Sequence, residues 1–250
     1  KEDWRGLCSN FYNEDYRHLP GMPSDGDGAN INEHGFRGPE IAKEKPANTF
    51  RIFLIGSSTM FGAGSDDETQ ISSVLQDKFA ENDFDFNIEV INAGAFGAWS
   101  KNEVLLIKNK LMDFNPDLIV VYDGVAERYG KQGENEISWK NRWSEICNLG
   151  KQNGFDTVII LQPFLESGLS SFTSHDYKTF AKHGFSVQLD WYPLYSKQLE
   201  ALSKNCAKAV DMTHIFDRIL GDLFFDNAYT GIRANQIIAD NFYQEIIPLI

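Results

Sequence analysis

The chain has 250 residues, 42% of them hydrophobic and 13% aromatic, which is enough to bury one substantial core. Asp and Glu outnumber Lys and Arg by 36 to 23, so the formal net charge is −13. This charge repels polyanions and argues against nucleic acid or an anionic membrane surface as a partner. We therefore expect a single acidic α/β domain.

The first 48 residues are dense in turn-forming Gly, Pro, Asp and Asn, above all at residues 19–28 and 34–39. We expect residues 1–48 to form an irregular arm that packs on a body of residues 49–250. Aromatic side chains are available to hold the arm in place: Phe11, Tyr12, Tyr16 and Phe36.

From residue 50 onward, short apolar runs alternate with longer amphipathic stretches at intervals that suit βαβ units. The strands are expected at residues 50–56, 86–92, 117–122, 156–161 and 207–211. Their nearly continuous Val, Ile and Leu content indicates burial on both faces, which is typical of a parallel sheet. Three helices are expected from their apolar faces: Ile71, Val74, Leu75 and Phe79; Tyr195, Leu199 and Leu202; and, beginning at about Ile232, Ile238, Phe242 and Ile246.

Residues 163–192 interrupt this alternation with Pro163, Gly168, a Ser/Thr cluster and two histidines, His175 and His183. We interpret them as a loop that leaves the carboxyl end of the fourth strand. Ligands of open parallel sheets bind at that edge, so the loop could wall a cleft. A surface insertion with no part in binding is an equal alternative.

The residues that follow the strands carry the candidate chemistry. The first strand breaks at once into Gly56-Ser57-Ser58-Thr59, the second into small residues at 92–97, and the third into Gly124-Val-Ala126-Glu127. The serines could present a nucleophile, cap a helix, cradle a phosphate or form an ordinary turn. A phosphate cradle is excluded, because no GxxxxGK[ST] or GxGxxG spacing and no nearby lysine is present.

These blocks resemble, in order and content, the SGNH or GDSL hydrolase family of serine esterases and lipases, over essentially residues 50–240. The resemblance implies a three-layer α/β/α sandwich around a five-stranded, mostly parallel, flavodoxin-like sheet, with which the periodicity agrees. It also implies site residues: Ser58 as the nucleophile, Gly94 as an oxyanion donor, Gly124 in the third block, and Asp226 as the acid of the last block.

Two blocks depart from the family pattern. The third block usually carries an Asn whose side chain donates to the oxyanion, and this chain has Ala126 there. The last block usually carries the catalytic His three residues after its Asp, and this chain has Tyr229. A tyrosine with its usual pKa near 10 keeps its proton at neutral pH and is a poor base for a serine.

Other residues could replace the missing base. Asp211-Met-Thr-His214 also fits the Asp-x-x-His spacing, but its context matches the last block less well, and His214 is better explained as a polar residue bordering the fold. His34 is a remoter candidate. Asp123 and Glu127 could act as paired carboxylates, although solvated loop charges are the commoner explanation in so acidic a chain.

Four tryptophans could stack on a sugar ring, since aromatic faces suit amphipathic ligands, although ordinary packing is the commoner explanation for each: Trp99, Trp139, Trp143 and Trp191. The cysteines, Cys8, Cys147 and Cys206, lack the spacing of a zinc site, and their odd number leaves at least one unpaired in a monomer. We expect no metal and no cofactor.

Two functions follow from these blocks. In the first, an active ester hydrolase or acyl transferase acts on acylated carbohydrates or small esters with a substitute base. In the second, which the departures favour, a degenerate cleft binds such a ligand or a partner with impaired turnover. No run is long and apolar enough to span a membrane. The compartment is open, with an upstream anchor conceivable and an extracellular or envelope location favoured over the cytoplasm.

Overall fold

The computed structural model describes residues 29–129, 135–165, 167, 191–221, 223–224 and 228–250. Five parallel strands form one sheet in the order β2-β1-β3-β4-β5. Their bounds are Thr49–Gly56 for β1, Asn87–Asn92 for β2, Leu118–Asp123 for β3, Asp156–Leu161 for β4 and Lys208–Asp211 for β5. The predicted fold class is confirmed, and each strand lies within a residue of its predicted range.

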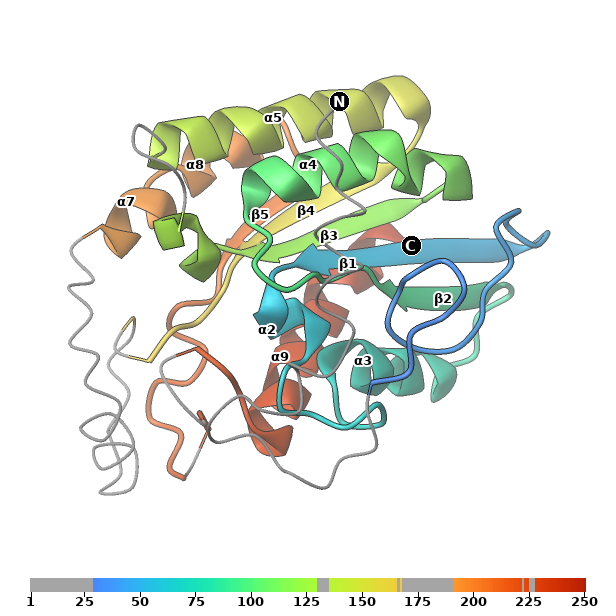
Figure 1. The fold of residues 1–250 in the computed structure, drawn as a ribbon, viewed down its shortest axis with the longest axis horizontal. Coiled ribbons are helices and arrows are strands. Elements are labelled where there is room, and N and C mark those ends of the chain that lie inside the picture. The colour runs from blue at the N-terminus through green and yellow to red at the C-terminus, as the bar shows by residue number, and fades with distance from the viewer. Residues whose placement is uncertain (1–28, 130–134, 166, 168–190, 222, 225–227) are drawn as a thin grey trace.

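Burial on both faces explains why the strands could be recognised. Every residue of β3 is buried, and its centre, Val120, is 0% exposed. Helices cover the two faces, as Figure 1 shows: α4 (Ser100–Asn109) and α5 (Glu136–Asn153) lie over one, and α3 (Ile71–Ala80) and α9 (Ile232–Ile246) over the other. The result is the expected three-layer α/β/α sandwich.

Shorter elements complete the described fold: α2 (Ser58–Phe61), α7 (Tyr192–Ser196) and α8 (Leu199–Ser203), with the 3-10 helices η2 (Leu111–Phe114), η3 (Val125–Tyr129) and η4 (Ile247–Leu249). The predicted face of Tyr195, Leu199 and Leu202 therefore belongs to two helices, not one. A tight turn separates them, in which the Gln198 N–H donates to Tyr195 O. No helix among the described residues is long and apolar enough to cross a membrane.

The described part of the N-terminal arm packs on the body through Phe36, one of the aromatic residues expected to hold it. The ring of Phe36 is 2% exposed and contacts those of Phe53 and Phe114 edge to face. Phe11, Tyr12 and Tyr16 lie outside the described residues, and the division of the chain at residue 48 stays a prediction.

A disulfide joins Cys147 of α5 to Cys206 just before β5. Both cysteines are buried, and 59 positions separate them in the sequence. The pairing is not predictable from the sequence, because nothing in the local context of the cysteines shows which helix faces which strand. The bond ties α5 to the edge of the sheet.

Candidate active site

Ser58 is the first residue of α2, directly after β1. Gly56 makes this abrupt turn possible: a Cβ on it would lie 2.3 Å from Tyr122 O and 2.6 Å from Met60 Cβ. Ser57 occupies the N-cap position of α2, but its side chain makes no capping hydrogen bond. The arrangement therefore gives no support to a capping role for Ser57.

Tyr229 lies against the serine, as expected if tyrosine stands in the place of the histidine. Its hydroxyl donates a hydrogen bond of 2.8 Å to Ser58 Oγ, across 171 positions of sequence. The phenol thus acts as a donor toward the atom from which a base would have to remove a proton. Asp226, the acid implied for the same block, lies outside the described residues.

The loop that carries Tyr229 is fastened to the loop that follows α2. Asn235, near the start of α9, is 2% exposed and sits between them. Its Oδ1 accepts from Thr230 Oγ1 at 2.7 Å, while its Nδ2 donates to Ser65 Oγ and Thr69 O at 2.9 Å each. The distance between Tyr229 and Ser58 is therefore set by buried hydrogen bonds on both sides.

Arg37, from the N-terminal arm, holds the far end of α2. The guanidinium group is buried, and its Nη1 donates to Phe61 O at 2.9 Å and Gly62 O at 2.8 Å. Its Nη2 donates to Ser65 O at 2.7 Å, and its Nε pairs with Asp67 at 2.8 Å. A planar guanidinium suits such a set of fixed acceptors. The arm is thus part of the support of Ser58.

Asn92, the last residue of β2, holds α2 from the other side. Its Nδ2 donates to Met60 O at 3.0 Å, and its Oδ1 accepts from the Gly94 N–H at 2.9 Å. A Cβ on Gly94 would lie 2.3 Å from Phe61 N, so this segment passes directly over the helix backbone. The structure shows a reason for glycine here besides the expected oxyanion role, which stays a prediction.

The end of β3 brings the third block to the same edge of the sheet. Gly124 has φ +131°, and a Cβ on it would lie 2.6 Å from Leu161 Cδ1 and 2.7 Å from the Tyr192 hydroxyl. Ala126 is 5% exposed and carries no polar side-chain atom. Its methyl group cannot donate a hydrogen bond, so the side-chain donor that the resemblance implies for this block is not supplied by Ala126.

Gln162, which follows β4, was not among the predicted site residues, although its place after a strand end was a signal. Its side chain is 0% exposed, and its Oε1 accepts from Thr59 Oγ1, next to Ser58, at 3.2 Å. Its Nε2 has no hydrogen-bond partner among the described residues. The Tyr192 hydroxyl donates to Gln162 O at 2.7 Å.

Neither described histidine contacts Ser58. His34 lies edge to face with Phe114 and its Nε2 is 3.1 Å from Ile41 O. The imidazole of His214 is 62% exposed and its Nδ1 lies 3.0 Å from Asp217 Oδ2. The interpretation of His214 as a polar residue at the border of the fold agrees with this exposure. His175 and His183 lie outside the described residues.

The interpretation of Asp123 and Glu127 as solvated loop charges is wrong. Asp123 is 0% and Glu127 5% exposed, because α4 and α5 close over the end of β3. Burial, and then the charge of Asp123, raise the pKa of Glu127 to about 8. Glu103 of α4 lies in the same cluster, and burial raises the pKa of its carboxyl group well above the usual range.

The tryptophans divide into two kinds. Trp139 and Trp143 are 0% exposed and belong to the core, so they cannot stack on a ligand. Trp99 and Trp191 are partly exposed, and Arg142 lies over the Trp99 ring at 5.1 Å. Only this second pair keeps faces that a ligand could reach.

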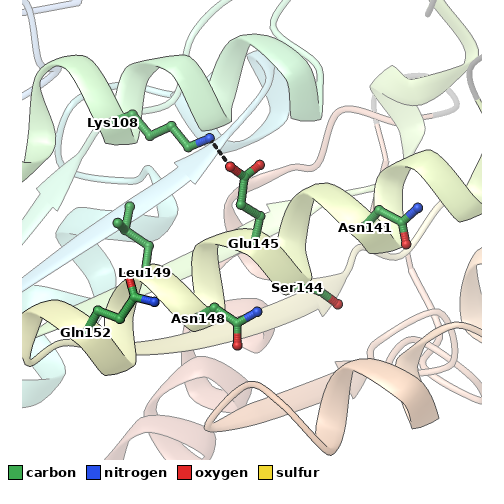
Figure 2. A pocket seen from close by; sticks show the side chains of 7 residues that line it. All are labelled: Lys108, Asn141, Ser144, Glu145, Asn148, Leu149 and Gln152. Atoms are coloured by element: carbon green, nitrogen blue, oxygen red, sulfur yellow. Dashed lines mark hydrogen bonds and ion pairs between the residues drawn. The ribbon is translucent and has the colours of Figure 1, made fainter.

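A polar hollow lies on the outer side of α4 and α5, where Lys108 pairs with Glu145 (Figure 2). Its lining residues are Lys108, Asn141, Ser144, Glu145, Asn148, Leu149 and Gln152. All of them belong to the two helices, and none follows a strand end. This hollow is therefore separate from the candidate active site.

No protein-family model and no curated protein matches the sequence. Solved structures do match. An acetyl xylan esterase, AlAXEase, superimposes with a TM-score of 0.61 at 15% identity, covering 79% of this chain and 100% of that one. TesA gives 0.59 at 15% identity, covering 80% and 99%. A putative lipolytic protein of the G-D-S-L family from Desulfitobacterium hafniense gives 0.60 at 12%, covering 78% and 98%.

The chain therefore has the fold of the SGNH-type esterases, which at these identities is all that the likeness establishes. At the candidate site, a serine just after β1 accepts a hydrogen bond from a tyrosine, and a buried alanine follows β3.

Proposed function

We propose that this chain is an SGNH-fold protein whose cleft binds a small ester or carbohydrate-like ligand, with ester hydrolysis impaired. The observation that carries the proposal is the 2.8 Å hydrogen bond from the Tyr229 hydroxyl to Ser58 Oγ. A serine nucleophile needs a base that accepts its proton. The phenol is here a donor, and it occupies the place where such a base would stand.

The third block supports the same proposal. Tetrahedral intermediates of acyl transfer need donors aimed at the oxyanion, and losing one side-chain donor costs about 10²–10³ in kcat. Ala126 supplies no such donor. The Gly94 N–H, the donor that the resemblance implies, donates to Asn92 Oδ1 at 2.9 Å. Impairment thus has two independent sources, the base and the oxyanion site.

The first experiment is intact-mass labelling with a fluorophosphonate, run beside hydrolysis of short-chain esters. Ser58→Ala tests the proposed nucleophile, and Ser57→Ala is the matched control one residue away. We expect no labelling of the parent protein and no turnover that depends on Ser58. Labelling that disappears in Ser58→Ala alone would refute impairment and favour an active hydrolase, whose base would be sought first at His175 and His183.

The second experiment restores the missing groups. Ala126→Asn combined with Tyr229→His should raise Ser58-dependent ester hydrolysis above the parent level, because it returns a donor and a base to their family positions. Tyr229→Phe is the control that removes the hydroxyl without adding a base. No gain in the double variant, with its fold intact by circular dichroism, would contradict this explanation of the impairment.

Ligand binding is tested independently of turnover. Because structures with this fold include an acetyl xylan esterase, acetylated xylo-oligosaccharides are the first ligands to titrate by calorimetry. Binding to both the parent and Ser58→Ala would support the proposed cleft. Absence of binding across acetylated sugars and short esters would argue against this ligand class.

A further inference from the structure

Three carboxylates are packed behind the third block, where α4, α5 and η3 meet the end of β3. Glu103 is 1% exposed, Asp123 0% and Glu127 5%. Both carboxylate oxygens of Glu103 and the Oδ1 of Asp123 have no hydrogen-bond partner of ordinary geometry among the described residues. The Gly124 N–H and Trp143 nevertheless act on the Asp123 carboxyl group. Charged carboxylates are almost never left in this state, since burying an unpaired charge is very costly.

The neighbours of the cluster among the described residues supply too little positive charge to neutralise it. From α5, Arg142 acts on all three carboxylates, and its Nη2 lies 3.4 Å from Glu127 Oε2. The tyrosines of α7, Tyr192 and Tyr195, face the carboxylates with pKa values raised above the usual range, first by burial. Among the described residues, one guanidinium therefore faces three carboxyl groups, and full ionisation would bury net negative charge.

The α5 tryptophans contribute hydrogen-bond donors rather than charge. Trp139 Nε1 donates to Asp123 Oδ2 at 2.8 Å. Trp143 also lies near Asp123 and acts on its carboxyl group, but its Nε1 makes no hydrogen bond of ordinary geometry to a described residue. A metal does not resolve the imbalance, because no group of side chains among the described residues could hold one. Retained protons do resolve it.

The cluster also makes hydrogen bonds to the segment that borders the candidate cleft. Glu127 Oε1 accepts from the Ser100 N–H at 2.6 Å, at the start of α4. Arg142 Nε donates to Ser100 Oγ at 2.7 Å. Glu127 and Arg142 thus hold the end of the 93–100 segment. This segment begins beside Gly94, over α2. Glu127 itself directly follows Ala126 of the third block. One buried carboxyl group holds the second and third blocks together. The bonds from Ser100 and the charge of Arg142 favour ionised Glu127, but burial and the charge of Asp123 outweigh them.

We propose that Glu103, Asp123 and Glu127 form a proton-holding cluster that lets the start of α4 and the 93–100 segment pack on the end of β3 in acidic and neutral solution. When the protons leave in alkaline solution, repulsion among the three buried carboxylates loosens this packing. The cluster is a pH-sensitive support of the cleft. This proposal depends on the proposed function in one respect only: it takes the 93–100 segment to be a wall of the ligand cleft.

The sign of the pH dependence follows from proton linkage. Glu103 and Glu127 hold protons when folded at pH values where an unfolded chain has released them, since burial, followed by the neighbouring carboxylates, raises the pKa of both. The stabilising contribution is therefore complete below the unfolded pKa and is lost as pH rises, for Glu127 up to about 8. For each such proton, the folding equilibrium constant falls about tenfold with every unit by which the pH rises across that window.

The test is urea unfolding from pH 5.5 to 9.5 for the parent and for Glu127→Gln and Glu103→Gln. Gln copies a protonated carboxyl group, and at Glu127 it keeps the acceptor for Ser100. In the parent, the folding equilibrium constant should fall as the pH rises. In each variant this fall should be smaller by about tenfold per pH unit, and each variant should be more stable than the parent at pH 8. Glu200→Gln, which removes a carboxylate that is 85% exposed, is the matched control and should follow the parent.

Hydrogen exchange of peptides spanning 93–103, corrected for the intrinsic pH dependence, tests the loosening itself. Protection should fall above pH 8 in the parent and persist in Glu127→Gln. Parallel slopes for the parent and both Gln variants would overturn the proton-holding cluster, and unchanged protection at alkaline pH would overturn its link to the segment. Neither readout uses a substrate or a serine probe, so failure here is distinguishable from failure of the proposed function.

Discussion

Gly94 offers a direct test of how the candidate nucleophile is positioned. A Cβ at this residue would lie 2.3 Å from Phe61 N and 2.8 Å from Met60 C, whereas ordinary contacts begin at 3.4 Å. Gly94→Ala must therefore separate this segment from α2 by about 1 Å, since both contacts are with backbone. Gly94 has no positive φ to complicate the comparison, so the added methyl group is the whole perturbation.

The helix cannot yield freely, because Arg37 and Asn92 bind the carbonyl groups at its end. We expect Gly94→Ala to lose about 1–3 kcal/mol of unfolding free energy, the usual cost of overpacking. If the added methyl group displaces α2, the hydroxyl groups of Tyr229 and Ser58, now 2.8 Å apart, move out of hydrogen-bonding range. In the background of Ala126→Asn with Tyr229→His, a displacement of 1 Å should remove about 10²-fold of any restored activity.

Urea unfolding followed by circular dichroism measures the first effect and ester hydrolysis the second. Gly97→Asn is the control in the same segment, because a Cβ there meets nothing within 4 Å and Asn tolerates its φ of +66°. A Gly94→Ala protein within 0.5 kcal/mol of the parent, about the effect of an ordinary surface substitution, would refute the close approach on which this reasoning depends.

Two further expectations concern the supports of the fold. Cys147 and Cys206 can be replaced by Ala in a Cys8→Ala background, which prevents mispairing. The loss of unfolding free energy in urea should be about 4 kcal/mol, because the disulfide restricts the chain entropy of a loop of 59 positions. An unchanged midpoint would mean that the pair is not bonded in solution. Trp139→Phe removes the N–H that donates to Asp123 and should lower the unfolding free energy by about 1–3 kcal/mol. The loss should be larger at pH 9 than at pH 6, because that bond favours the charged carboxylate. An equal loss at both pH values would contradict a titrating Asp123.

The sheet could be predicted from sequence because burial on both faces leaves a local record. Each central strand is a short Val/Ile/Leu run, and such a run has few alternatives. The pairing of Ser58 with Tyr229 was also accessible, since the order of the blocks places Ser58 after the first strand and Tyr229 just ahead of the last helix. Its geometry is consistent with the expectation that a tyrosine standing for the histidine would bond to the serine.

What escaped prediction depends on contacts between distant segments. Asp123 and Glu127 resemble solvated loop charges in sequence, and only the packing of α4 and α5 over the end of β3 buries them. The pairing of Cys147 with Cys206 depends in the same way on how α5 lies along the sheet. Arg37 could be predicted to tie the arm to the body, but nothing local indicates that its guanidinium reaches the carbonyl groups of α2.

The distribution of polar groups around Ser58 bears on the choice between binding and turnover. Arg37 is 4% exposed and Asn92 1% exposed, so burying them has a desolvation cost that only well-made hydrogen bonds offset. Most of those bonds go to the backbone around α2, and the others go to Asp67 and Gln70. They fix the position of Ser58. Groups held rigidly in place lower the entropic cost of binding a ligand, whether or not the ligand is turned over. The support of Ser58 is therefore compatible with the proposed ligand binding, and the labelling of Ser58 decides whether turnover accompanies it.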